Sequence, residues 1–455
     1  MFRPAKARVT TRLLQATIHT LELYSIYLGK ELGLYEALKF ERRITPPELA
    51  RTAGIAPRYA REWLEQQAVA GFLRVESTTA PAEARRYWLP AEHTNVLVAE
   101  DHPAHLAPLA QMVAGIGGAL QRVVNAYRSG GGVAYPHFGA AFRAGQAGIN
   151  RPAFLSDLVA RWIPALPDLH SALMSTRMRV ADVGSGAGWS TLAMAKAFPQ
   201  AEVVGFDADP ASVHDAQRNA AAHGVAVRFE IRDAAAVAED GPFDLVLVLE
   251  ALHDMARPDE ALRAIRETLA PGGSVLVADE KVGDHFHAPA DDLERLMYGW
   301  SIVHCLPVAM AEQPTAAIGT VIRAATVQAM VKAEHTQPER GSFFVTRAAS
   351  SRPARSKGMA RTSIPIRLGT SACGSVVART WWRPTRFPRR HFGSLRRSCT
   401  CSEGRARSSL RPRAWRAAVR CGASSPAVRA TSQVGPANSA RPFWASSRGA
   451  GSTCG

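Results

Sequence analysis

The stretch DVGSGAG at residues 182–188 decides the fold. A short apolar run precedes it at 179–183, and a helical pattern of apolar residues follows it at 189–198. Glycines in such a turn let the backbone bend sharply and approach a ligand without obstruction by a Cβ atom. Because plain strand-to-helix connectors use glycine in the same way, the stretch needs support from the chain around it.

The surrounding chain alternates short apolar strands with helical segments. This alternation is typical of βαβ units, in which neighbouring strands run parallel. It predicts an α/β fold in which helices cover a parallel sheet. The strands are expected at 179–183, 202–206, 227–231, 245–249 and 274–278.

Acidic residues stand at the ends of three successive strands. Asp207 ends the second strand, where a carboxylate can accept hydrogen bonds from both hydroxyls of a ribose. Asp233 ends the third strand, where a side chain can meet the edge of an adenine. Asp182 directly precedes the glycines, which suits a ligand with a positive amino group better than a pyrophosphate. These positions favour S-adenosylmethionine over a dinucleotide as the cofactor.

With these residues the sequence resembles the class I S-adenosylmethionine-dependent methyltransferases. The order and spacing of three motifs match that family, at 180–188, 205–207 and 271–273. Over about residues 15–333 the chain is similar to the members with an N-terminal winged helix. The segments that carry this similarity are Gly33-Leu34-Tyr35, Pro47-Glu48-Leu49-Ala50, residues 59–64, Asn150-Arg151-Pro152 and Leu252-His253-Asp254-Met255.

The resemblance implies a Rossmann-like sheet, S-adenosylmethionine as the cofactor and a small molecule as the methyl acceptor. In that family the first domain usually builds a dimer and closes over the acceptor, so we expect a homodimer through the N-terminal domain. Cofactor contacts are expected from the glycine turn and from residues that follow the next three strands. These are Asp182, Gly184, Ser185, Gly186, Gly188, Asp207, Ala208, Asp233, Ala234 and Glu250.

His253 and Asp254 are the candidate catalytic residues. Methylation of a hydroxyl requires a group that takes the hydroxyl proton. A His-Asp pair at the end of the fourth strand supplies this base in winged-helix O-methyltransferases, so the resemblance implies His253 as the base and Asp254 as a neighbour that orients it. The alternative is a histidine that only caps the strand, because methylation of carbon or nitrogen needs no such base. Glu250 and Glu280 are weaker candidates for the base.

The segment 291–306 reads as a helix that carries three aromatic or imidazole side chains. Tyr298, Trp300 and His304 are candidates for lining the acceptor site. Side chains at helical spacing more often pack into a core, so packing is the favoured interpretation.

The N-terminal part predicts a winged helix. Thr45-Pro46-Pro47-Glu48 is typical of a helix start, a second helix is expected at 57–70, and two strand-like pieces follow at 72–76 and 86–89. Such a domain can read DNA, which gives a second function hypothesis, a transcriptional regulator that binds S-adenosylmethionine without turnover. Arginines and glutamates balance over residues 45–71, whereas phosphate binding needs net positive charge. We therefore favour a dimerisation or cap role over DNA binding.

The charge of +16 comes from the C-terminal part. Residues 341–455 hold 22 of the 55 basic side chains and one of the 39 acidic ones, so residues 1–340 are slightly acidic. Cys305 is the only cysteine of residues 1–340, and no apolar run approaches the roughly 20 residues of a membrane span. A cytoplasmic protein that does not enter membranes is expected. No metal site is predicted, since His391, Cys399 and Cys401 lack a fourth ligand.

The sequence divides into four segments. They are a winged-helix domain at 1–100, a helical connector at 101–170, a methyltransferase domain at 171–335 and a basic tail at 336–455. Within the tail only 342–346 reads as a strand. The rest fits either a disordered arm that binds nucleic acid or a product of a shifted reading frame, and the near absence of acids favours the second explanation.

Overall fold

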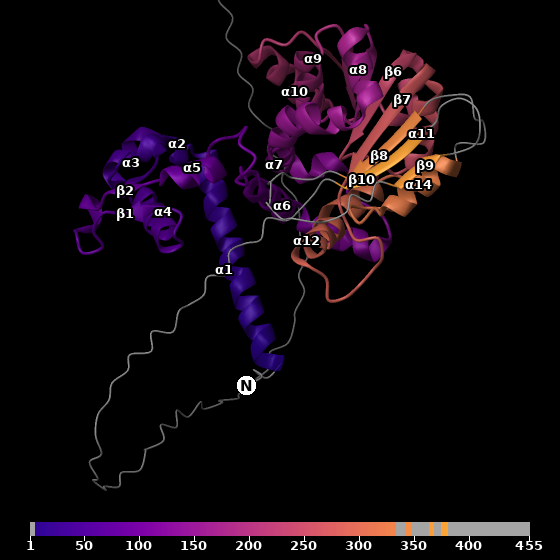
Figure 1. Cartoon of the computed structure of the whole chain (residues 1–455). Helices are drawn as coiled ribbons and strands as arrows, with labels where there is room; N and C mark the ends of the chain where they lie inside the picture. Colours follow the sequence, from indigo (N-terminus) through magenta and orange to yellow (C-terminus); the bar gives the residue numbers. More distant parts are fainter. Residues whose placement is uncertain (1–4, 334–341, 348–363, 368–374, 381–455) are drawn as a thin grey trace, which may run out of the picture. The chain divides into compact units, whose positions relative to one another are not determined.

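The structure is a computed structural model that describes residues 5–333, 342–347, 364–367 and 375–380. A sheet with strand order β5-β4-β3-β6-β7-β8-β10-β9 forms its largest layer (Figure 1). All five strands expected from the sequence are present as β3 to β7, so the predicted α/β fold is confirmed. The strands are β3 Arg179–Val183, β4 Glu202–Asp207, β5 Arg228–Ile231, β6 Phe243–Leu249, β7 Leu269–Asp279, β8 Ser342–Arg347, β9 Ile364–Arg367 and β10 Ser375–Thr380.

Strand β3 lies at the point where the strand order reverses. The chain runs outward from β3 to β4 and β5, and then crosses back to add β6 and β7 on the other side. Val183 at the end of β3 pairs with Phe206 of β4 and Val248 of β6, all in parallel register. Open α/β sheets bind ligands beyond the carboxyl ends of the strands at such a point.

Two layers of helices bury the two faces of the sheet, which explains the near-continuous apolar runs of the strands. Val180 and Leu245 face one layer, and Ala181 and Val246 face the other, because successive side chains of a strand point to opposite faces. The first layer contains α8 Pro167–Ser175, α9 Trp189–Ala197 and α10 Pro210–Ala222; the second contains η6 Ala234–Asp240, α11 Pro258–Glu267 and α14 Ala324–Ala333 (Figure 1).

The N-terminal domain is a winged helix, as predicted. Thr45 and Glu48 form a capping box at the start of helix α3, in which the Thr45 N–H donates to Glu48 Oε2 at 2.8 Å, and Gly54 ends that helix at a φ of 65°. A two-stranded antiparallel ribbon follows the second helix of the pair. The elements are α1 Ala5–Glu31, α2 Leu34–Ala37, η1 Lys39–Glu41, α3 Pro46–Ala53, α4 Pro57–Val69, β1 Arg74–Val75, η2 Ala82–Ala84, β2 Tyr87–Trp88 and α5 Ala91–Leu97.

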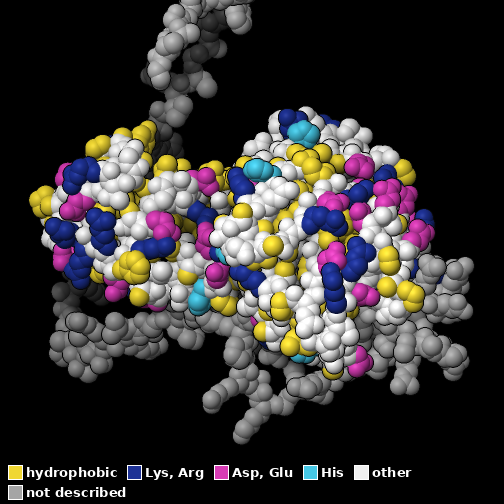
Figure 2. Space-filling view, turned by 90° about the horizontal axis from the view of Figure 1, so that it is seen from above, with side chains coloured by type: hydrophobic (Ala, Val, Ile, Leu, Met, Phe, Trp, Pro, Cys, Tyr) yellow, Lys and Arg dark blue, Asp and Glu magenta, His cyan; other side chains and the backbone are white. Residues whose placement is uncertain are grey.

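Helix α4, the second helix of the pair, does not offer free positive charge. Arg58 forms an ion pair with Glu62, and Arg61 forms one with Glu65 at 3.2 Å. On the face shown in Figure 2, basic and acidic side chains are interspersed and form no large patch of one sign. Both arginines of α4 are thus paired with glutamates of the same helix, whereas phosphate binding depends on net positive charge.

A helical connector joins the winged helix to the sheet. The helices α6 and α7 pack so closely that glycine is needed at two contact points. A Cβ atom on Gly115 would lie 2.6 Å from Phe142 Cβ, and one on Gly145 would lie 2.7 Å from the Met112 backbone nitrogen. A glycine-rich segment at 129–132 ends α6, with Gly130 at a φ of 74° after the last residue of the helix. The connector consists of α6 Pro108–Ser129, η3 Tyr135–Phe138, α7 Gly139–Pro152, η4 Ala153–Trp162 and η5 Ile163–Ala165.

The segment expected as one helix at 291–306 is divided. It forms α12 Asp292–Trp300, the π-helical η8 Ser301–Cys305 and α13 Leu306–Ala309. Beyond α14, the expected strand at 342–346 is present as β8, which pairs in parallel with β7, and the short strands β10 and β9 follow at the sheet edge. The hypotheses for the rest of the tail, and His391, Cys399 and Cys401, lie outside the described residues. Within the part of the chain that is described, no helix has the length and hydropathy needed to cross a bilayer.

Candidate active site

The glycine loop after β3 is built from backbone conformations that other residues rarely adopt. Gly184, Gly186 and Gly188 have φ values of 76°, 53° and 79°. At Gly184 a Cβ atom would also lie 2.6 Å from Ala251 Cβ, so a side chain there is excluded twice. The loop is fixed to the next strand because the N–H groups of Gly184 and Ser185 donate to Phe206 O at 2.8 and 3.0 Å.

Asp207 at the end of β4 lies against this loop. Its Oδ2 accepts a hydrogen bond from the Gly186 N–H at 2.8 Å, and its Oδ1 accepts one from the Asp209 N–H at 2.8 Å. Burial raises the pKa of Asp207 to about 6, against the opposing effect of the two N–H donors. The carboxylate thus has two ordered acceptor atoms beside the loop, as ribose recognition requires.

A cavity of about 400 Å³ opens over the loop and the carboxyl ends of the strands. Nine of the predicted site residues line it, so strand ends that are separate in the sequence meet around one space. Three predicted residues, Asp182, Gly188 and His253, do not line it. The nine are Gly184, Ser185, Gly186, Asp207, Ala208, Asp233, Ala234, Glu250 and Asp254.

Asp182 does not line the cavity, so its contact with the cofactor stays a prediction. Asp182 is buried beneath the loop, where its Oδ2 accepts hydrogen bonds from Ser190 Oγ and Thr191 Oγ1, both at 2.6 Å. It lies on the same face of β3 as Val180, so it points toward the start of α9. Its observed contact is with the helix that follows the glycines. Gly188 likewise serves as the residue before α9.

Asp233 and Glu250 stand at the ends of β5 and β6. Asp233 Oδ1 accepts a hydrogen bond from the Ala235 N–H at 2.8 Å and so caps η6. Glu250 has a φ of 56°, which is unusual for a residue with a side chain and is found mainly at functional sites. Burial and then the charges of Glu280 and Asp279 raise the pKa of Glu250 well above its usual value.

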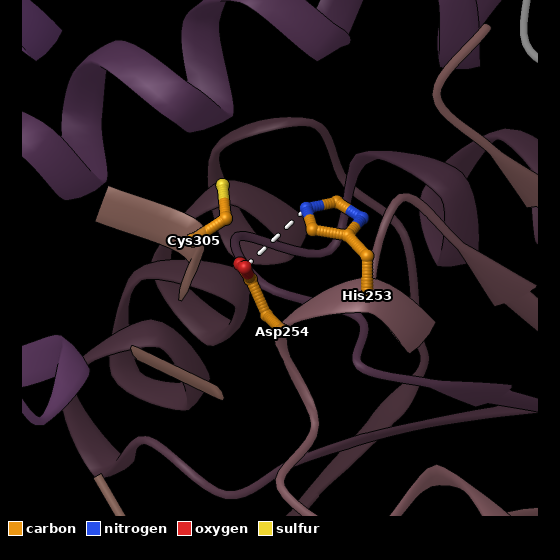
Figure 3. Close-up of side chains that lie close together, drawn as sticks. All are labelled: His253, Asp254 and Cys305. Atoms are coloured by element: carbon orange, nitrogen blue, oxygen red, sulfur yellow. Dashed lines mark ion pairs between the residues drawn. The ribbon is translucent and has the colours of Figure 1, made fainter. Parts of the chain in front are cut away.

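His253 does not end a strand, which corrects the expectation from the sequence. β6 ends at Leu249, and His253 lies in the 3₁₀ turn η7 Leu252–Asp254. Its Nδ1 lies 2.6 Å from Asp279 Oδ1, and its Nε2 lies 3.3 Å from Asp254 Oδ1 (Figure 3). The carboxylate that orients the imidazole through Nδ1 is therefore Asp279 at the end of β7, and Asp254 lies between His253 and the cavity.

The effect of nearby charges on the pKa of His253 outweighs the effect of its burial. Burial acts to lower the pKa of His253, but the carboxylates of Asp279 and Asp254 act in the opposite direction and leave it raised well above its usual value. Reasoning from the sequence misses Asp279 because it is 26 residues from His253. One feature of the sequence could have indicated this contact: Asp279 ends the predicted strand that follows β6 and pairs with it.

The opposite wall of the cavity comes from the connector, for which the sequence predicts no site residue. Tyr135 donates its hydroxyl hydrogen to Gln146 Oε1 at 2.7 Å, and Arg143 pairs with Asp215 at 2.9 Å. Tyr135, Arg143, Gln146 and Phe154 all line the cavity.

Tyr298, Trp300 and His304 do not line the cavity. His304 stacks on Phe142, with the ring centres 3.9 Å apart. The favoured interpretation of these side chains as packing residues agrees with this placement.

Comparisons with known proteins agree with this geometry. Residues 174–331 match a family model described as a methyltransferase domain, and residues 21–99 match one described as an Rv2258c-like winged HTH domain. A demethylmenaquinone methyltransferase of Thermus thermophilus is 37% identical over 28% of this chain and 56% of its own length. A ubiquinone biosynthesis O-methyltransferase of Cereibacter sphaeroides is 36% identical over 24% and 44%. The chain thus spans about half the length of these curated relatives.

Solved structures match over more of the chain. The mitomycin 7-O-methyltransferase has a TM-score of 0.52 at 18% identity, covering 72% of this chain and 92% of its own. The human N-acetylserotonin methyltransferase in complex with SAM has a TM-score of 0.53 at 16% identity, covering 74% and 94%. At such identities these likenesses show the fold. Residues 174–331 therefore form a methyltransferase domain, residues 21–99 form a winged helix-turn-helix domain, and the chain has the fold of S-adenosylmethionine-dependent methyltransferases.

Proposed function

We propose that this protein transfers a methyl group from S-adenosylmethionine to a hydroxyl group of a small-molecule acceptor by in-line displacement. The observation that carries the proposal is that one cavity is lined by the glycine loop, Asp207 and Asp254. The proposed cofactor site and proton acceptor thus share one space. The proposal is tested by turnover with a panel of small hydroxylated aromatic compounds.

The residues present fit the cofactor. The backbone of Gly184 to Gly186 gives the close approach that an extended nucleoside ligand needs, and Asp207 offers two acceptor oxygens for the ribose. We assign the adenine edge to Asp233 and Ala234, with Ala208, Ser185 and Glu250 as further contacts. Asp182 and Gly188 act indirectly in this proposal, by holding the loop on α9.

The bound cofactor supplies a methyl group on a cationic sulfur, so alignment and exclusion of water account for most of the acceleration. The chain's part in the chemistry is to receive the hydroxyl proton. We assign this to the pair of Asp254 and His253: Asp254 reaches the cavity and receives the proton, and His253, which its raised pKa keeps protonated, backs it at 3.3 Å. Asp279 fixes the imidazole from the other side at 2.6 Å.

The pH dependence of cofactor binding should follow Asp207. Its pKa is raised to about 6, with Asp182 and Asp209 as the nearby acids. Ribose recognition needs the ionised carboxylate, so S-adenosylmethionine affinity is expected to fall about tenfold by one pH unit below that value. The same raised pKa means that the folded apoprotein takes up a proton that the unfolded chain does not, so this group's contribution to stability rises as pH falls through 6.

Calorimetric titration between pH 8 and pH 5 checks this expectation, with thermal unfolding of the apoprotein measured in the same buffers. The variant Asp207→Asn is the control, because an amide cannot titrate and its affinity should not step near pH 6. A wild-type affinity that stays constant through this range would show that Asp207 does not bind the ribose as an anion.

We further propose the division of the chain at 1–100, 101–170, 171–335 and 336–455, a cytoplasmic location, and a homodimer formed through the N-terminal domain. The dimer is supported by α1, which exposes large apolar side chains at helical spacing. Leu21 is 62% exposed and Leu28 is 49% exposed. Contiguous apolar surface of this kind is typical of association sites, and a second copy of the same helix would cover it. The row is Val9, Leu13, Leu14, Ile18, Leu21, Tyr24 and Leu28.

Introducing charge into this row should separate the subunits. The double variant Leu21→Glu/Leu28→Glu is expected to elute as a monomer in size-exclusion chromatography with light scattering, whereas the wild type elutes as a dimer. The control is Val69→Glu, which places the same charge at an apolar residue that is 90% exposed on α4. A monomeric wild type, or a double variant that remains dimeric, would exclude α1 as the interface.

A further inference from the structure

Cys305 is a buried reactive group that the proposed function leaves unused. It ends η8 and is the only free cysteine among the described residues. Its sulfur lies 3.3 Å from His304 Nδ1 and within 4.8 Å of ligand atoms of His253 and Asp254. The thiol therefore belongs to the same cluster as the proposed proton acceptors, although it comes from a different part of the chain.

The thiol, the imidazole and the carboxylate converge on one point. One ligand atom from each of His253, Asp254 and Cys305 lies within 4.8 Å of the other two. Figure 3 shows the sulfur, the imidazole Nε2 and the carboxylate oxygen at the corners of a triangle, with His253 and Asp254 on one turn and Cys305 on another element. Nε2 and Asp254 Oδ1 are 3.3 Å apart, and two such ligands of a tetrahedral zinc ion are separated by about 3.3 Å.

The surroundings of the triangle match those of metal ligands. Asp279 binds His253 through Nδ1, which leaves Nε2 directed at the triangle, and a carboxylate in this position is the usual outer partner of a zinc-bound histidine. Asp254 Oδ1 is buried without a hydrogen-bond partner, so it has unused acceptor capacity at this point.

We propose that His253, Asp254 and Cys305 form a site for a thiophilic divalent cation of the zinc class, with its fourth position open to the cavity. A thiolate with an imidazole selects zinc-like cations over magnesium or calcium, which prefer oxygen ligands only. Asp254 lines the cavity, so a water or an acceptor oxygen can complete the coordination. Binding releases the thiol proton, and any proton on Nε2, to solvent.

Occupation of the site has a consequence that rests on the proposed function. The cation would take the Asp254 carboxylate that otherwise receives the hydroxyl proton, together with the Nε2 atom that backs it, so metal binding should inhibit methyl transfer. The binding itself does not depend on that assignment and is measured separately.

Cobalt(II) is the probe, because a thiolate ligand gives the bound ion a near-ultraviolet charge-transfer absorption. We expect the metal-free full-length protein to bind one equivalent of cobalt with this absorption, and zinc to displace it. Cys305→Ser should abolish the band, and His253→Gln should weaken it. The matched control is Cys399→Ser/Cys401→Ser, which removes two other thiols of the chain and should keep the band.

Two results would overturn the site. One is a wild-type spectrum identical to that of Cys305→Ser, with circular dichroism showing that both are folded. The other is loss of the band only in the Cys399→Ser/Cys401→Ser control. Cobalt uptake is also measured on the wild type itself, so the proposal can fail on the wild-type spectrum whether or not the variants fold. If cobalt binds at Cys305 but zinc leaves turnover unchanged, the site stands and the assignment of His253 and Asp254 as proton acceptors is wrong.

Discussion

Replacing Asp207 with alanine is expected to lower the affinity for S-adenosylmethionine about 100-fold. Two hydrogen bonds from ribose hydroxyls to a carboxylate contribute about 1.5 kcal/mol or more each, and about 1.4 kcal/mol corresponds to a tenfold change in affinity. The change also removes the acceptor of the Gly186 N–H, so the glycine loop loses one of its fixed points. Calorimetric titration of wild type and variant measures the difference.

Stability separates this effect from simple unfolding. Burial raises the pKa of Asp207, which means that the ionised side chain is unfavourable in the folded apoprotein at neutral pH. The variant should therefore bind cofactor far more weakly while its unfolding temperature falls little. Asp168→Ala is the control, because Asp168 is an exposed carboxylate of α8 outside the cavity. Wild-type affinity in Asp207→Ala would refute the cofactor assignment.

The strands of the sheet could be predicted because their signal is local. β3 and β6 are buried on both faces, so each appears in the sequence as a short unbroken apolar run. The signal of the glycine turn is also local. Gly184 and Gly186 have positive φ values, which glycine adopts readily, so the glycines themselves mark the turn that faces the ligand site. These elements predict where the strand order reverses and that Asp207 lies at this point.

The sequence does not show which atoms surround a side chain in the folded protein. It suggests that Asp182 faces the ligand, whereas in the structure Asp182 lies under α9, where Ser190 and Thr191 donate to its Oδ2. Asp279 reaches His253 only because β7 pairs with β6. Tyr135 and Gln146 reach the cavity through the packing of the connector, which no local pattern specifies.

Replacing Asp254 with asparagine is expected to lower kcat for a hydroxyl acceptor by about 10²- to 10⁴-fold, the range for loss of a positioned proton acceptor. Asparagine keeps the size of the side chain but cannot hold the proton. Cofactor affinity should be unchanged, since the glycine loop and Asp207 remain intact. Glu312→Gln is the matched control, because Glu312 also lines the cavity but forms its ion pair with Arg257, at 3.7 Å.

The double variant His253→Ala/Asp254→Asn tests whether the pair acts as a unit. Because the proton passes to a coupled pair held by Asp279, removing both members should cost little more than removing either one. If the two side chains acted independently, the losses of kcat in the two single variants would multiply in the double variant. If neither single variant lowers kcat, the acceptor atom does not lose a proton to this pair, and methylation of nitrogen or carbon replaces O-methylation as the reaction. The cofactor assignment would be unaffected by that result, since Asp207 and Asp254 belong to different elements that line the cavity and are tested by separate variants.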